Sequence, residues 1–85
     1  MVKLVKLQAN LHEVVMDGGD IYFSYSQPIA FSSKLYNKFY ITTKKYSNTT
    51  TRHCKWLQNV FHNAILVDQD ELDLLIKEDL EEYNY

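Results

Sequence analysis

Residues 44–55 read Lys-Lys-Tyr-Ser-Asn-Thr-Thr-Thr-Arg-His-Cys-Lys, and they divide the chain into two parts of different character. Short apolar and β-branched runs precede this stretch, and helically spaced apolar residues follow it. Residues 47–50 are all N-cap types, whose side-chain oxygens accept hydrogen bonds from the free N–H groups that begin a helix. We therefore predict a helix over residues 50–62, with strands before it.

Apolar spacing supports this helix and predicts a second one. Cys54, Leu57 and Phe61 lie at i, i+3 and i+7, which forms one apolar stripe on a helix. A further helix is expected to begin at Asp68, because Glu71 three residues later completes an Asp variant of the capping box. Residues 64–67, between the two helices, are expected to form a strand or a link, and residues 83–85 to fray.

Five runs before residue 44 have the composition of strands. These runs are residues 2–8, 11–16, 21–26, 29–32 and 38–43. Asp-Gly-Gly-Asp at residues 17–20 predicts a turn, and Pro28 interrupts the ladder because proline lacks an N–H. The connections are too short for helical crossovers, which favours an antiparallel meander. We predict an α+β fold in which an antiparallel sheet of three to five strands is packed on one face by two C-terminal helices.

Length and composition indicate one folded domain over residues 1–85, since 46% of the residues are hydrophobic and 14% aromatic. The single cysteine, Cys54, cannot form an internal disulfide, which favours a reducing compartment. Charges interrupt the apolar residues of the first segment, and no apolar run approaches the length of a membrane span. We therefore expect a cytoplasmic protein without a membrane partner, located in the host cytoplasm if it is viral.

The sequence offers little for metal or catalytic chemistry. His53 and Cys54 are adjacent, so a helix directs them about 100° apart, and the chain contains no Cys-x-x-Cys pair. Cys54 lies on the expected buried stripe, where a thiol is inert, and nothing nearby assembles a base for it. We predict no cofactor, no metal and no catalytic residue, and expect a protein that binds rather than an enzyme.

The first candidate site is the basic segment around the start of the predicted helix. The candidate residues for binding an anion or nucleic acid are Lys44, Lys45, Thr49, Thr50, Arg52, His53 and Lys55. Free N–H groups and the helix dipole favour an anion at such a terminus. The alternative is that the hydroxyls only cap the helix and the cations only solvate the surface.

The second candidate site is an acidic face at the end of the chain. Residues 1–67 carry eight Lys or Arg against three acids, a net +5, whereas residues 68–85 carry eight acids against Lys77, a net −7. The candidate protein-binding residues are Asp70, Asp73, Glu78, Glu81 and Glu82. Closely spaced carboxylates can imitate a phosphate backbone, although solubility alone also explains them. Pairing of this helix with the basic segment of a second copy would instead give a homodimer.

Two motifs resemble a family of small uncharacterised proteins of tailed phages and prophages. Residues 24–31 read Ser-Tyr-Ser-Gln-Pro-Ile-Ala-Phe, and residues 46–53 read Tyr-Ser-Asn-Thr-Thr-Thr-Arg-His. The family pairs a Ser-Tyr-x-x-Pro-Ile-Ala strand with a Tyr-Ser-x-Thr-Thr-x-Arg/Lys-His helix start, and the match covers residues 22–57. The resemblance implies a phage or prophage setting.

In such a setting, the leading hypothesis is a non-enzymatic protein that binds a host or viral protein through its acidic surface. Its target would be a host defence component of the restriction or CRISPR type. The alternative is a nucleic-acid-binding module that uses the basic segment at residues 44–55.

Overall fold

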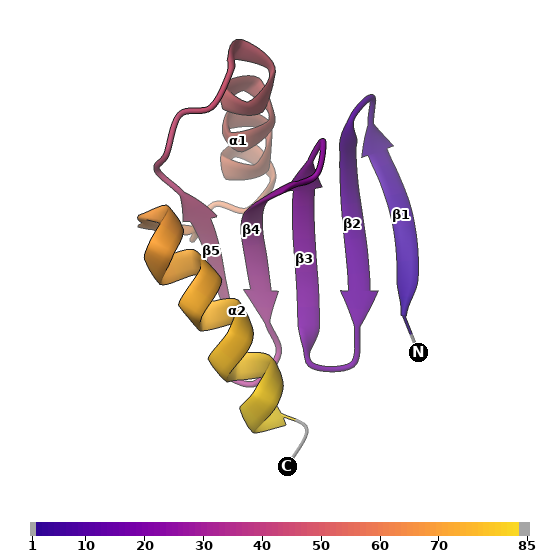
Figure 1. Cartoon of the computed structure of the whole chain (residues 1–85), viewed down its shortest axis with the longest axis vertical. Helices are drawn as coiled ribbons and strands as arrows, with labels where there is room; N and C mark the ends of the chain where they lie inside the picture. Colours follow the sequence, from indigo (N-terminus) through magenta and orange to yellow (C-terminus); the bar gives the residue numbers. More distant parts are fainter. Residues whose placement is uncertain (1, 84–85) are drawn as a thin grey trace.

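A computed structural model describes residues 2–83 and contains one six-stranded sheet and two helices (Figure 1). The elements in chain order are β1 (Lys3–Gln8), β2 (Leu11–Met16), β3 (Gly19–Ser24), β4 (Gln27–Ser33), β5 (Lys38–Thr42), α1 (Asn48–Val60), β6 (Ile65–Val67) and α2 (Gln69–Tyr83). The α+β class is confirmed. Within the described residues, neither helix combines the length and the apolar character needed to cross a membrane.

The sheet has more strands than expected and is mixed. Its strand order is β1-β2-β3-β4-β5-β6; the first five strands form the antiparallel meander, and β6 pairs in parallel with β5. The prediction of three to five antiparallel strands was therefore too small. Helix α1 connects β5 to β6 and runs back along the sheet, opposite to the direction of β5. Residues 65–67 therefore start from the same end as β5 and pair with it in parallel.

The two helices lie on opposite faces of the sheet, so the prediction that both cover one face was wrong (Figure 1). Tyr22, Ile41 and Leu57 belong to the core under α1, whereas Phe31 and Leu72 belong to the core under α2. The reason lies in β4 and β5, which are apolar at consecutive positions rather than at alternate ones. Such strands are buried on both faces and need a cover on each side.

Two turn residues behave differently from what their type suggests. Pro28 does not end the strand, because the pairing between β3 and β4 shifts register at Tyr22 and Phe23, and a bulge tolerates a missing donor. Gly19 opens β3 where a side chain has no room: an added Cβ would lie 2.5 Å from the backbone oxygen of Ser32.

Both helix starts follow the capping chemistry expected from the sequence. Helix α1 begins two residues earlier than predicted, and Ser47 caps it by accepting a 3.1 Å hydrogen bond from the backbone N–H of Thr50. Asp68 accepts a 2.8 Å hydrogen bond from the Glu71 N–H at the start of α2. The expected fraying concerns mostly residues 84–85, which lie outside the described residues; Tyr83 is still the last residue of α2.

Candidate basic pocket and acidic helix face

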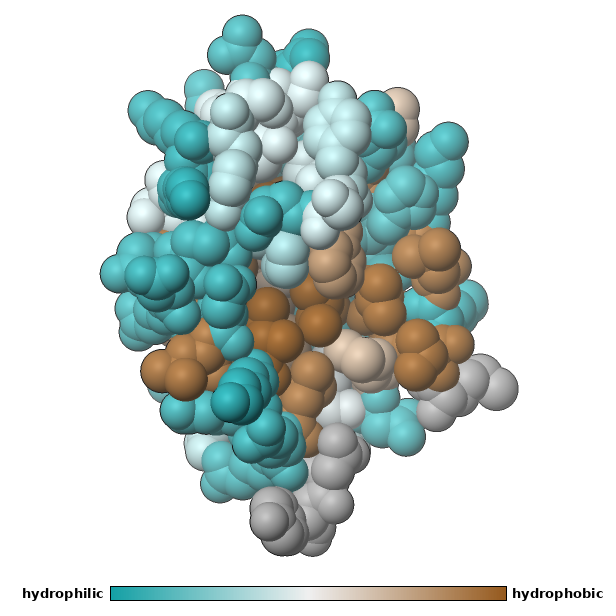
Figure 2. All heavy atoms as spheres, viewed as in Figure 1, coloured by the Kyte–Doolittle hydropathy of each residue, from teal (hydrophilic) through white to brown (hydrophobic). Residues whose placement is uncertain are grey.

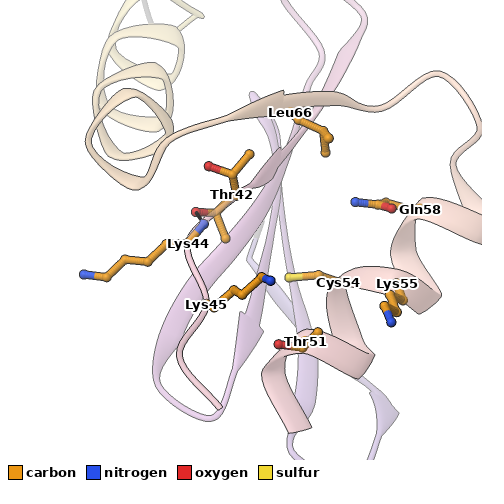
Figure 3. A pocket seen from close by; sticks show the side chains of 9 residues that line it. Thr42, Lys44, Lys45, Thr51, Cys54, Lys55, Gln58 and Leu66 are labelled. Atoms are coloured by element: carbon orange, nitrogen blue, oxygen red, sulfur yellow. Dashed lines mark hydrogen bonds between the residues drawn. The ribbon is translucent and has the colours of Figure 1, made fainter. Parts of the chain in front are cut away.

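A basic pocket of about 240 Å³ lies between the β5–α1 connection, α1 and β6 (Figure 3). It is lined by Thr42, Thr43, Lys44, Lys45, Thr51, Cys54, Lys55, Gln58 and Leu66. Three of the predicted cations are therefore brought together. They line one pocket because the residues between β5 and α1 run alongside the helix.

The lysines of the pocket differ in orientation. In Figure 3 the side chains of Lys45 and Cys54 point toward one another, whereas Lys44 points away from the pocket. The Lys44 ammonium lies 5.0 Å from the ring centroid of Tyr46, a cation–π distance. Neither Lys45 nor Lys55 has a carboxylate partner among residues 2–83. Both cations are exposed, so the pocket carries uncompensated positive charge.

Cys54 does not neutralise this positive charge. Burial raises the pKa of its thiol, so the group stays protonated at neutral pH. Burial also raises the pKa of Tyr46, with a smaller effect from Asp73 and Asp70, which places the start of α2 near this side of the loop. The pocket is thus cationic on its lysine side and apolar at Cys54 and Leu66.

Thr50 and His53 were predicted to meet a ligand, and both are instead buried, with 3% and 4% of their surface exposed. Ser24 joins them: its Oγ lies 2.7 Å from His53 Nδ1 and 3.0 Å from Thr50 Oγ1. The Thr50 hydroxyl also accepts a 3.2 Å hydrogen bond from Ser47. This network, Ser24-Thr50-His53, connects the end of β3 to the first turns of α1.

The start of α1 is less available to a ligand than the sequence predicts. The Thr50 N–H is used by the Ser47 cap, and the backbone N–H of Thr51 is bonded to the Ser47 carbonyl. Burial lowers the pKa of His53, partly offset by a hydrogen bond to the Ala9 backbone, which indicates a neutral imidazole. Of the other predicted residues, Thr49 is half-buried and Arg52 is exposed. The available cationic surface therefore lies along the side of α1 rather than at its N-terminus.

The predicted acidic residues all lie on the solvent side of α2. The exposed carboxylates of this helix are those of Asp70, Glu71, Asp73, Glu78, Glu81 and Glu82. Two of them have hydrogen-bond partners: Asp73 accepts a 2.9 Å hydrogen bond from Gln69 of the same helix, and Glu82 accepts one of 2.8 Å from the Tyr36 hydroxyl. Asp79 lies on the inner side of the helix with 3% of its surface exposed.

Sequence reasoning missed six of the residues that line the pocket, namely Thr42, Thr43, Thr51, Cys54, Gln58 and Leu66. A signal existed for two of them, because Thr51, Lys55 and Gln58 are spaced at i, i+4 and i+7 and so share one side of a helix. No local signal marks Leu66, which reaches the pocket only through the parallel pairing of β6. Within residues 2–83, no group of three or more metal-ligating side chains comes together.

These features define a small α+β domain with a mixed sheet between two helices, a lysine-lined pocket beside one helix and an acidic face on the other. The chain belongs to a family described as a family of unknown function (DUF8033), whose profile matches residues 2–73. No curated protein and no solved structure matches the chain.

Proposed function

We propose that this domain is a phage-type, non-enzymatic protein that binds a host protein on the face of the sheet that carries α2. The observation that carries the proposal is a row of apolar side chains that α2 leaves uncovered. An apolar area beside a charged rim is the usual composition of a protein-binding surface.

The row follows from the strand register. Leu4 pairs with Val14, Val14 with Ile21, and Ile21 with Phe31, so the four side chains share one face of the sheet. Phe31 is buried under α2, and Ile21 is half-buried at its margin. Leu4, at the far end, is 67% exposed. Figure 2 shows the corresponding apolar area beside α2.

The uncovered area has room for one further element. Two to three strands at about 4.8 Å spacing give a width of roughly 10 to 14 Å. A helix with its side chains is about 10 Å across. A helix of the partner can therefore pack beside α2 and complete the layer that α2 begins on this face.

The charge of α2 indicates what such a partner carries. Six exposed carboxylates against Lys77 leave a net −5 on the outer side of a helix about 22 Å long. This is one charge per about 4 to 5 Å, close to the one per 3.4 Å of a single DNA strand. A basic surface complements this density, and the nucleic-acid channel of a defence nuclease is such a surface.

The distribution of these acids argues against a purely stabilising role. Glu81 and Glu82 lie in the last turn of α2, where the helix dipole disfavours an anion by about 0.3–1 kcal/mol each. Glu78 and Glu82 are also like charges at i, i+4, which costs a few tenths of a kcal/mol more. Glu82 has an internal partner, the Tyr36 hydroxyl, whereas Glu78 and Glu81 have no hydrogen bond or ion pair among residues 2–83 and suit an external cationic partner.

The test is capture from a bacterial host lysate, with the full chain immobilised and the retained proteins quantified by mass spectrometry. Two variants should lose the specific partner: L4E, on the uncovered row, and E78K/E81K, on α2. E78K/E81K is expected to fold at least as well as the wild type, because lysines suit the end of a helix.

K3E is the matched control, because residue 3 neighbours Leu4 but faces the opposite side of the sheet. It should retain the partner. Single-stranded DNA added to the column should release the partner if the carboxylates occupy a nucleic-acid channel. Retention of the same proteins by wild type, L4E and E78K/E81K alike would refute the proposal, as would the absence of any specific protein.

A further inference from the structure

We propose that the basic pocket is a phosphoryl-binding site, in which Lys45 and Lys55 hold one phosphate group from either side. The phosphate belongs to a small phosphate monoester or to the backbone of a single-stranded nucleic acid. This site lies on the α1 side of the sheet and does not depend on the protein-binding face.

The first support is that two lysines from separate elements line the same pocket. Lys45 comes from the β5–α1 connection and Lys55 from the second turn of α1, and both line the same pocket. Neither has a carboxylate partner among residues 2–83. Two like charges at the border of one pocket repel each other, and an anion bound in the pocket removes that cost. Each ammonium offers three donors, which suits the several acceptor oxygens of a phosphate.

The rest of the lining fits an oxyanion with an organic substituent. Thr42, Thr43 and Thr51 also line the pocket, and a threonine hydroxyl can donate to further oxygens. Cys54 and Leu66 supply an apolar side. A volume of about 240 Å³ is below the roughly 300–1,000 Å³ of pockets that enclose a whole drug-sized ligand. The pocket is thus sized for a phosphoryl group and its nearest atoms, with the remainder of the ligand outside.

Direct titration followed by NMR tests this site. The ¹⁵N-labelled full chain is titrated with phenyl phosphate and, separately, with an oligothymidylate, at constant ionic strength with chloride as the balancing anion. We expect saturable shifts of the amide signals of Lys45, Thr51, Cys54 and Lys55, with a Kd of about 1 mM or tighter.

Lysine variants inside and outside the pocket separate a built site from general surface charge. K45Q/K55Q should weaken the binding at least about tenfold, because both charge-assisted contacts are lost. K34Q/K38Q is the matched control: it also removes two positive charges, from exposed lysines that do not line the pocket, and should change the Kd by about twofold or less. The chemical-shift dispersion of each free variant verifies its fold.

The two probes distinguish the sources of the phosphate. Equal affinity for phenyl phosphate and the oligothymidylate assigns the site to a small monoester. Tighter oligothymidylate binding that grows with strand length and falls with salt, at a log–log slope of about −0.7 per phosphate, assigns it to a nucleic-acid strand. The inference is overturned if neither probe saturates, if K45Q/K55Q binds like the wild type, or if K34Q/K38Q loses as much affinity as K45Q/K55Q.

Discussion

Replacing Ser24 by alanine tests whether the Ser24-Thr50-His53 network holds α1 to the sheet. The Ser24 side chain is 1% exposed, and its hydroxyl lies 2.7 Å from His53 Nδ1. Alanine removes only one oxygen atom, so the cavity left behind is small. The effect then comes almost entirely from the groups that lose their partner.

The magnitude follows from the two partners. Thr50 keeps its hydrogen bond from Ser47, but His53 Nδ1 is left buried without its 2.7 Å partner. An unsatisfied buried polar group costs about 1–3 kcal/mol. We therefore expect S24A to lower the free energy of unfolding by about 2 kcal/mol. For a domain of this size, each kcal/mol corresponds to a fall in Tm of about 4–8 °C.

Urea denaturation followed by circular dichroism measures this change as a shift of the midpoint at constant m-value. S26A is the control, because Ser26 is exposed in the same turn, and it should stay within about 0.5 kcal/mol of the wild type. In the S24A/H53L double variant both members of the pair are apolar, so its loss should be smaller than the sum of the single losses. An S24A loss below about 0.5 kcal/mol would refute the account of the network, since that is the range of ordinary surface substitutions.

Three further predictions follow from the same structure. Because burial lowers the pKa of His53, the folded state binds fewer protons than the unfolded state below pH 6.5. The free energy of unfolding should therefore fall as the pH drops below that value. In urea titrations at several pH values, an H53Q variant should show a weaker dependence of this free energy on pH. G19A should destabilise the domain more than G18A, because its Cβ would lie 2.5 Å from the Ser32 backbone oxygen, whereas at Gly18 the nearest atom belongs to the movable side chain of Leu80 at 3.0 Å; equal urea midpoints would contradict this. The Cys54 thiol should react with a disulfide probe more slowly in the native chain than in urea, because it is partly buried and its pKa is raised; equal rates would show that it is open to solvent.

Local chemistry predicted most of the individual elements. Capping residues located the starts of both helices within two residues, and the strand runs before residue 44 correspond to β1–β5. The placement of the helices was missed because the sheet was expected to be covered on one face only. The runs at residues 29–31 and 39–41 are continuously apolar, which is typical of strands covered on both faces. That pattern, read alone, favours one helix on each side.

The candidate site was predicted in composition but not in geometry. Thr50, His53 and Leu57 are spaced at i, i+3 and i+7, so the same periodicity that placed Leu57 in the core would have placed the other two beside it. Their polar character pointed instead to a ligand. The approach of Lys45 to Lys55 depends on the path of the β5–α1 connection, and no periodic pattern encodes such a path.

A chain with net charge −2 can carry a phosphate site because the placement of the charges matters more than their sum. The carboxylates of α2 lie across the sheet from α1, two layers away at about 10 Å per layer, which exceeds a Debye length of about 8 Å at physiological salt. Asp70 and Asp73, at the start of α2, lie close enough to the β5–α1 connection to add to the effect of burial in raising the pKa of Tyr46, whose ring the Lys44 ammonium contacts. Lys44 contacts the Tyr46 ring, whereas Lys45 and Lys55 line the pocket without a carboxylate partner among residues 2–83. The sheet keeps the two charged surfaces apart, which is the arrangement that both proposals require: a cationic partner on one face and an anion on the other.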